Sequence, residues 1–199
     1  MNNKLLSIEE IFTILRGEDT YKSFVVNRII KIILGSSVIR AFSKGTKPLL
    51  MKGLKAIPIN EIDQLTTQTE FDSWHKSQVG KIQTILVRGD KETARFGNGE
   101  LYGHAAKVVN LYIGHLLLFS QYFKKVTINR VKHFLHVPLD RKVFIALKGE
   151  KSIIVPKSIK ELIPGTYDSI QNAIRKHALN AGLPAIYFDE YAWAYDKDL

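Results

Sequence analysis

The chain has 199 residues, with 29 Lys and Arg against 19 Asp and Glu, which gives a formal net charge of +10. This length suits one domain with a continuous core, or one compact body built from two helical lobes. The absence of cysteine excludes disulfide bonds and cysteine-based zinc sites. The positive charge favours a polyanionic partner, because cationic side chains that contact phosphates release condensed counterions. An ordinary basic protein without such a partner is the simpler alternative.

The sequence predicts a soluble, cytoplasmic protein with no membrane partner. Residues 1–6 show no signal peptide, and the apolar runs at 25–34 and 111–119 are too short or too interrupted to cross a bilayer. We expect a monomer that forms a single compact helical domain over residues 1–199.

Helical patterns fill the first half of the chain. Ser7 to Glu10 resembles a capping box for a short helix that ends near Gly17, and Asp19 is expected to cap a second helix that runs to Leu34. Glycines and prolines divide residues 35–58 into shorter helical pieces. A longer helix is expected near 69–86, where apolar and amide side chains recur at helical spacing: Phe71, Trp74, Gln78, Ile82 and Ile85.

The central stretch begins with a glycine-rich turn that contains Gly97 and Gly99, and a helix apolar on more than one face follows from Ala105 to Phe123. Such a helix is typical of a protein core. One stripe differs, because small and polar residues share a single helix face: Gly103, Lys107, Asn110 and Gly114. We expect the backbone around Lys107 to be approachable along this stripe.

A basic amphipathic segment follows from 124 to 136, and it is either a surface helix or a segment that faces nucleic acid. Asp140 then precedes the amphipathic run of Val143 to Leu147 and is placed to cap a new helix. A carboxylate there accepts backbone N–H groups, meets the positive end of the helix dipole, and is kept ionised.

In the last third of the chain, the residue pattern predicts an extended segment at 151–156 and helices at 158–163 and 168–181. The second of these helices is ended by Gly182 and Pro184. The aromatic segment 183–193 is expected to fold back on the core. Strand signals are scarce, and the predicted fold class is mostly α.

The chain combines a lysine-bearing helix behind a glycine-rich turn with a loop that ends in Pro138-Leu139-Asp140. This combination resembles the helix-hairpin-helix DNA glycosylase superfamily. The separation of Lys107 and Asp140, the absence of cysteine and the segment from Tyr187 to Trp193 are most similar to the archaeal 8-oxoguanine glycosylase branch. A phage-defence relative of that branch is equally compatible. The likeness covers about fifty residues and the aromatic tail.

The resemblance implies a two-lobed helical body that flips a modified base out of duplex DNA and excises it. It implies that Lys107 attacks the glycosidic carbon, that Asp140 acts as a base or electrostatic stabiliser, and that strand cleavage can follow through a Schiff base. No metal or cofactor is required. The excised base is either oxidised guanine or a hypermodified base of phage DNA, such as glucosylated hydroxymethylcytosine.

Further candidate residues surround this pair in the sequence. For the flipped base we single out Trp74, His104, Asn110 and Trp193. For contacts with DNA we single out Gly97, Gly99, Gly103, Arg130, Lys132, Arg141 and Lys142.

Two simpler interpretations stay open. Lys107 could reach solvent from an amphipathic helix while Asp140 only caps its own helix. The protein would then be a non-catalytic, basic, helical DNA-binding protein, whose salt-sensitive binding survives loss of Lys107.

Overall fold

The fold is known from a computed structural model that describes residues 17–35, 45–89, 101–118 and 122–195. Within these residues all regular secondary structure is helical, so the prediction of a mostly α fold is confirmed. The capping box at Ser7 and the turn with Gly97 and Gly99 lie outside the described residues.

Helix α6, Tyr102–Leu118, is the centre of the core. Residues on all its faces are buried, among them Ala105, Val109, Tyr112 and Leu116, as the apolar pattern predicts. Helices α2 (Glu18–Gly35), α5 (Gln68–Gly89) and α9 (Pro164–Asn180) pack against it. Helix α6 ends at Leu118 among the described residues, before the predicted end at Phe123.

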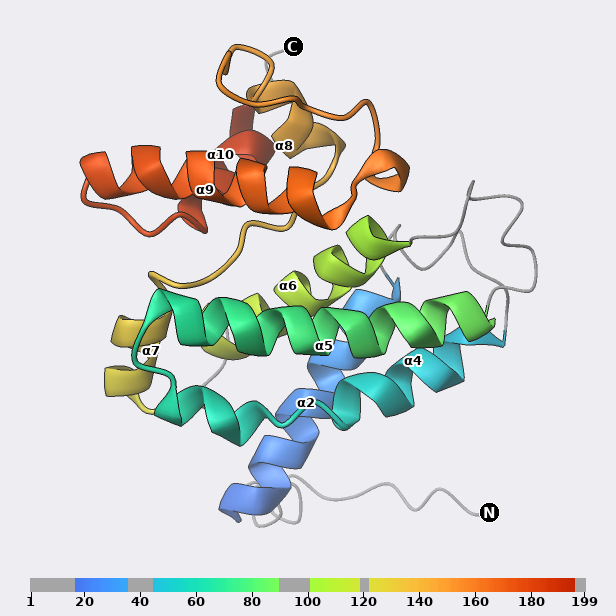
Figure 1. Cartoon of the computed structure of the whole chain (residues 1–199). Helices are drawn as coiled ribbons and strands as arrows, with labels where there is room; N and C mark the ends of the chain where they lie inside the picture. The colour runs from blue at the N-terminus through green and yellow to red at the C-terminus, as the bar shows by residue number, and fades with distance from the viewer. Residues whose placement is uncertain (1–16, 36–44, 90–100, 119–121, 196–199) are drawn as a thin grey trace.

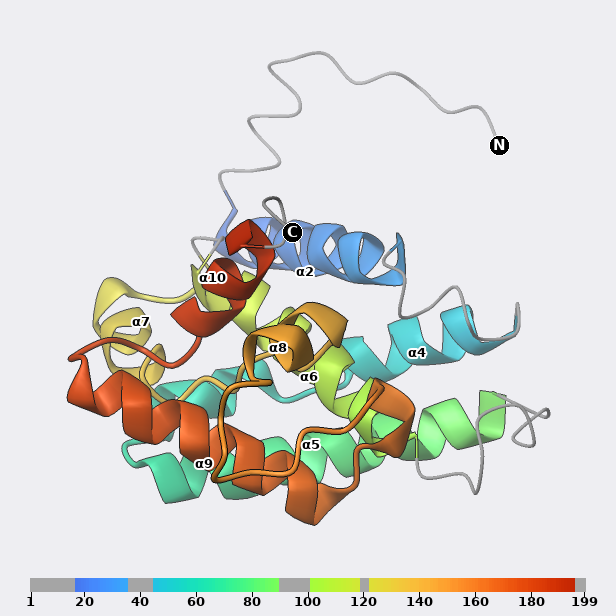
Figure 2. The same cartoon turned by 90° about the horizontal axis from the view of Figure 1, so that it is seen from above.

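The helices form two groups on either side of α6 (Figure 1). One group contains α2, α4 (Thr46–Lys55), α5 and α7 (Lys125–Val131), with the short 3₁₀ helix η1 (Ile59–Gln64) beside α7. The other contains α8 (Arg141–Ala146), α9 and α10 (Tyr187–Tyr195). Seen from above, α5 and α9 lie towards one side of the molecule and α2 and α10 towards the other (Figure 2). A single apolar cluster runs through both groups.

The segment between α6 and α8 differs from its prediction. The basic helix α7 stops at Val131, and residues 135–140 are extended until Asp140 begins α8. The apolar side chains of Leu135, Val137 and Leu139 are buried, so this connection crosses the protein interior rather than following its surface.

The last helices show two predicted features. Helix α9 ends where Gly182 adopts a φ of +68°, and the Leu183 N–H donates to the Ala178 carbonyl at 2.9 Å, as in a Schellman motif. The aromatic segment does fold back: α10 packs on α8, and Ala185, Ile186 and Ala192 are buried. Helix α9 begins at Pro164, four residues before its predicted start.

None of the helices in the described part of the chain has both the length and the apolar character needed to span a membrane.

Gly103 allows the 3₁₀ helix η3 (Ile159–Glu161) to pack on α6. The stability of the protein should therefore be sensitive to a methyl group added at Gly103. A Cβ on Gly103 would lie 2.3 Å from the Ile159 carbonyl oxygen and 2.9 Å from the Leu162 Cβ. We therefore expect Gly103→Ala to lower the free energy of unfolding by about 1–3 kcal/mol, the usual effect of overpacking.

Gly114 is the matched control, since it lies on the same helix and an added Cβ would have no neighbour within 4 Å. Gly114→Ala should leave stability unchanged or raise it by up to about 1 kcal/mol through helix propensity. Urea denaturation of the two variants measures the contrast; equal effects would contradict the packing role of Gly103.

Candidate functional site

The two residues that carry the sequence prediction meet in the structure. The Lys107 Nζ donates a hydrogen bond to the Asp140 Oδ2 at 2.9 Å, although the residues are 33 positions apart. Their side chains are 11% and 12% exposed, so the ion pair is largely removed from water and yet can be reached from it. A charge so placed is costly unless it is paired, and here each residue supplies the other's partner.

Asp140 holds its position because its two carboxylate oxygens have separate roles. Its backbone is extended, with φ −146° and ψ −175°, and its Oδ1 accepts the backbone N–H groups of Lys142 at 3.0 Å and Val143 at 3.2 Å. This is the predicted N-cap of α8. The cap fixes the carboxylate plane and leaves the Oδ2 for Lys107.

Asp189, in the first turn of α10, is a third charged group close to this pair. Burial, and after it the negative charge of Asp140, raise the pKa of Asp189 to about 7, while the charge of Lys107 opposes this shift. Its Oδ1 is buried without a hydrogen-bond partner in the described part of the chain. Asp189 is thus a carboxyl that is partly protonated near neutral pH, close to the Lys107–Asp140 pair.

Trp193 lies one helical turn after Asp189 on α10 and is 49% exposed. The Lys142 Nζ lies 4.0 Å above the centre of its ring, a cation–π contact. A half-exposed aromatic ring beside the charged groups is suited to stacking on a planar base. Sequence reasoning singled out Trp193 and Lys142 but missed Asp189, although an acidic residue one helical turn before an expected site residue is a usable signal.

His104 lies one turn before Lys107 on α6 and is buried. Burial, and after it the positive charges of Lys160 and Lys107, lower the pKa of His104 to about 4. A neutral imidazole therefore borders the lysine from the N-terminal side. Its role as a direct base contact stays a prediction.

Two of the predicted base-binding residues are held inside the protein instead. Trp74 is buried against Phe71, and its Nε1 donates to Glu61 at 2.9 Å. The Asn110 amide donates to the Val137 carbonyl at 3.1 Å and to the Tyr167 hydroxyl at 3.0 Å, and its oxygen pairs with His75. Both side chains are thus engaged in the core in this structure, which helical spacing alone does not reveal.

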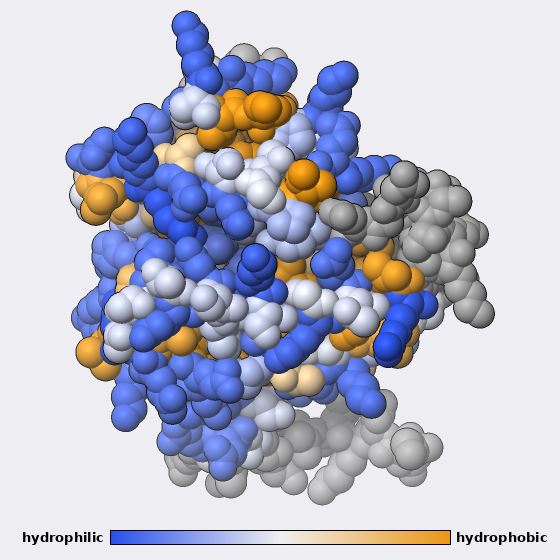
Figure 3. All heavy atoms as spheres, in the orientation of Figure 1, coloured by the Kyte–Doolittle hydropathy of each residue, from blue (hydrophilic) through white to orange (hydrophobic). Residues whose placement is uncertain are grey.

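The residues predicted to contact DNA separate into several groups. Ile159 and Leu162 cover Gly103 on the side where a Cβ would point. The Arg130 guanidinium donates to the Asp63 carbonyl at 2.6 Å and supports η1. Lys132 is partly exposed and Arg141 is exposed, and both stay candidates together with Lys142. The face over α5 and α9 is mainly hydrophilic (Figure 3).

A buried polar network, missed by sequence reasoning, borders a cavity of about 270 Å³ between α5 and α9. His136 pairs with the Tyr167 hydroxyl at 2.7 Å and with Asp72 at 2.7 Å, and Arg175 donates to both oxygens of Asp72. These contacts lower the pKa of Asp72 to about 2 against the effect of its burial. The network joins the two groups of helices beside α6.

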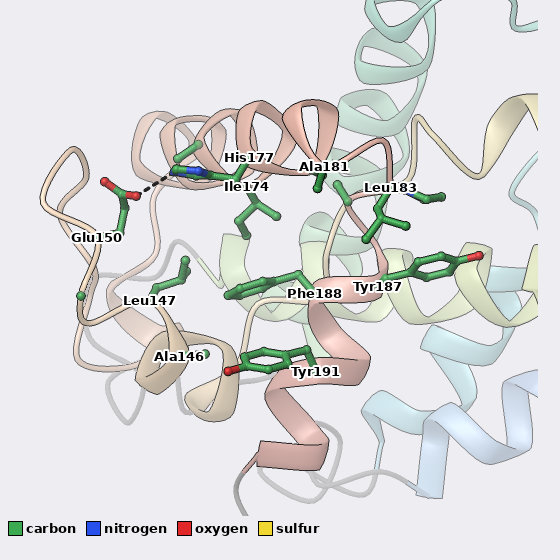
Figure 4. Close-up of a pocket in the computed structure, with 15 residues that line it drawn as sticks. Ala146, Leu147, Glu150, Ile174, His177, Ala181, Leu183, Tyr187, Phe188 and Tyr191 are labelled. Atoms are coloured by element: carbon green, nitrogen blue, oxygen red, sulfur yellow. Dashed lines mark hydrogen bonds and ion pairs between the residues drawn. The ribbon is translucent and has the colours of Figure 1, made fainter.

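A second cavity, of about 540 Å³, lies between α8, α9 and α10 (Figure 4). Its walls are apolar, and Phe188 and Tyr191 lie along it, while the Glu150–His177 ion pair of 2.9 Å closes one end. Lys107, Asp140 and Asp189 do not line it. Helix α10 therefore presents Phe188 and Tyr191 to this cavity and Asp189 to the charged site.

No group of three or more His, Asp or Glu in the described ranges is arranged to hold a metal ion.

The buried histidines predict a loss of stability in acid. Because the pKa of His104 is about 4 in the folded protein and about 6.5 when unfolded, only the unfolded chain takes up this proton between those values. Stability must fall as the pH decreases from 6.5 to 4, by up to about 1.4 kcal/mol per pH unit for this residue. Burial also lowers the pKa of His75 and His136, which adds to the slope.

His104→Leu should reduce that slope, and urea denaturation at pH 7, 6 and 5 measures it. An identical pH dependence in wild type and His104→Leu would contradict the burial of a neutral imidazole.

Comparison with known proteins completes the description of this site. No protein-family model, no curated protein and no solved structure matches the chain.

Proposed function

We propose that the protein is a DNA glycosylase that excises a modified base, with Lys107 as nucleophile and Asp140 as proton acceptor. The observation that carries the proposal is the 2.9 Å contact between an amine and a helix-capping carboxylate, both mostly buried, in a chain of net charge +10. Nucleophilic catalysis by lysine requires a nearby group that takes the ammonium proton, and Asp140 lies at hydrogen-bond distance.

The reaction begins with transfer of one Lys107 proton to the Asp140 Oδ2. The neutral amine attacks C1′ of the flipped nucleotide, the new N–C1′ bond forms, and the C1′–N bond to the base breaks with its electron pair on the base. Opening of the sugar then breaks C1′–O4′; O4′ takes a proton from the attached nitrogen, which leaves an iminium between Lys107 and C1′. Water hydrolyses this iminium to an abasic site, or loss of the C2′ proton expels the 3′ phosphate.

Asp189 supplies the proton that the departing base needs. Its raised pKa keeps a fraction of its carboxyl protonated near pH 7, and the Lys107–Asp140 pair contributes to that pKa. Two carboxyl groups in different environments thus have opposite tasks, as is common in acid–base catalysis. Trp193 stacks on the flipped base, and Lys142, over its ring, contributes positive charge next to the DNA backbone.

The substrate has two candidates, oxidised guanine in repair and a glucosylated hydroxymethylcytosine of phage DNA in defence. The alternative function is a basic DNA-binding protein in which Lys107 and Asp140 form only a structural ion pair. The positive charge supports both functions, whereas the neighbouring protonated carboxyl of Asp189 favours the glycosylase.

Borohydride trapping tests the mechanism. We expect wild-type protein to form a covalent adduct with duplex DNA that contains 8-oxoguanine or with glucosylated phage DNA, because borohydride reduces the iminium to a stable amine. Lys107→Gln should form no adduct on the same DNA, as judged by denaturing gel electrophoresis. The DNA that gives the adduct identifies the substrate class.

Two controls sharpen this experiment. Lys81→Gln removes a lysine of α5 that contacts Gln78, far from the pair in the sequence, and should leave trapping unchanged. Asp140→Asn keeps a good N-cap and removes the charge, so the excision rate of the folded protein should fall by about 10²–10⁴, with the folded fraction measured by circular dichroism. DNA binding without adduct or abasic product on either DNA would favour the binding-protein alternative.

A proton donor at Asp189 should make the excision rate depend on pH. If protonated Asp189 is needed, the single-turnover excision rate of wild type should decline as the pH rises through about 7, the value to which burial raises its pKa. Asp189→Asn donates a hydrogen bond but no proton, so its rate should be lower and flat across that range. A wild-type decline that persists in Asp189→Asn would assign the titration to another group.

A further inference from the structure

The extended connection that leads to Asp140 is held by side chains of the surrounding helices. Phe134, just before the connection, offers its carbonyl to the Gln68 amide of α5 at 3.0 Å. His136 is bound on both ring nitrogens, by Tyr167 and by Asp72. An extended segment in the interior has backbone groups that need partners, and here amide side chains provide them.

Val137 is hydrogen-bonded through both its N–H and its carbonyl, and Gln171 of α9 binds both groups. The Gln171 Oε1 accepts the Val137 N–H at 2.9 Å, and the Gln171 Nε2 donates to the Val137 carbonyl at 2.8 Å. Asn110, on α6, donates to the same carbonyl at 3.1 Å. The connection is therefore fastened to α9 and to the helix of Lys107 at one residue, three positions before Asp140.

We propose that Gln171 is a positioning residue: its two hydrogen bonds to Val137 set the place of Asp140 opposite Lys107. Gln171 is buried and reaches neither member of the pair, so it acts through the backbone of the connection. Its catalytic consequence depends on the function proposed above, whereas its effect on the ion pair does not.

Replacing Gln171 tests the positioning of Asp140 more selectively than replacing the other residues that bind the connection. Asn110 also pairs with His75 and Tyr167, and His136 with Asp72, so replacing either residue disturbs the whole polar network. Gln78 provides a matched control, since this buried glutamine of α5 contacts Trp74 and Lys81 and not the connection.

The test measures the energetic coupling of Lys107 and Asp140 by double-mutant cycles in urea denaturation. Lys107→Met, Asp140→Asn and their combination are made in wild type, in Gln171→Met and in Gln78→Met. Coupling between contacting residues changes an unfolding equilibrium constant by between about twofold and a hundredfold. We expect coupling in wild type and in Gln78→Met, and its loss in Gln171→Met.

Coupling that is absent in wild type, or unchanged in Gln171→Met, would overturn the positioning role. If Gln171→Met unfolds too readily to measure, Gln171→Glu, which keeps an oxygen for the Val137 N–H, is used in its place and should weaken the coupling.

A second measurement separates this proposal from the glycosylase itself. In Gln171→Met the rate of borohydride-trapped adduct should fall at least tenfold while the Kd for the same DNA changes less than threefold. Failure of wild type to trap any DNA would count against the glycosylase alone, since the coupling is measured without DNA. Normal trapping by Gln171→Met with lost coupling would show that the pair needs no positioning for chemistry, and this result would restrict Gln171 to a structural role.

Discussion

The ion pair between Lys107 and Asp140 constrains the rest of this fold. Helix α6 is surrounded by the core, and a lysine on such a helix is tolerated only if a counter-charge comes to it. The counter-charge belongs to a residue that must also begin a helix, so α8 has to start at one place and in one direction. The connection after α7 leads to that start, and α10 packs on the helix that begins there.

The interior of the molecule combines two kinds of interaction with different effects. Apolar packing along α6 supplies most of the stability and tolerates small shifts of one helix on another. The buried hydrogen bonds of His136, Tyr167 and Asp72 tolerate less, because a shifted partner leaves a polar group unpaired. Polar contacts concentrate where the two groups of helices meet, so they define how these groups are arranged.

Much of this arrangement could be predicted from sequence, because it depends on local patterns. Helical spacing predicted α2, α5 and the core helix, and the N-cap signal placed the start of α8 correctly. What spacing cannot show is which neighbour a side chain meets. Trp74 and Asn110 look available in the sequence and are used by the core. Gln171 lies in the apolar stripe of Tyr167, Ile170 and Ile174, and a polar residue at such a position signals a buried backbone partner.

The two-sided character of α10 has a consequence for the order in which the site is completed during synthesis. Lys107 and Asp140 precede α10 in the chain, so the ribosome adds the amine and its carboxylate before Asp189 and Trp193. A nascent chain that has formed α6 and α8 holds the ion pair without the acid and without the aromatic ring. Docking of α10 on α8 adds both at once, since Asp189 and Trp193 share one face of a single helix. In the proposed mechanism, the proton donor and the stacking ring therefore join the site together, after Lys107 and Asp140 have been synthesised.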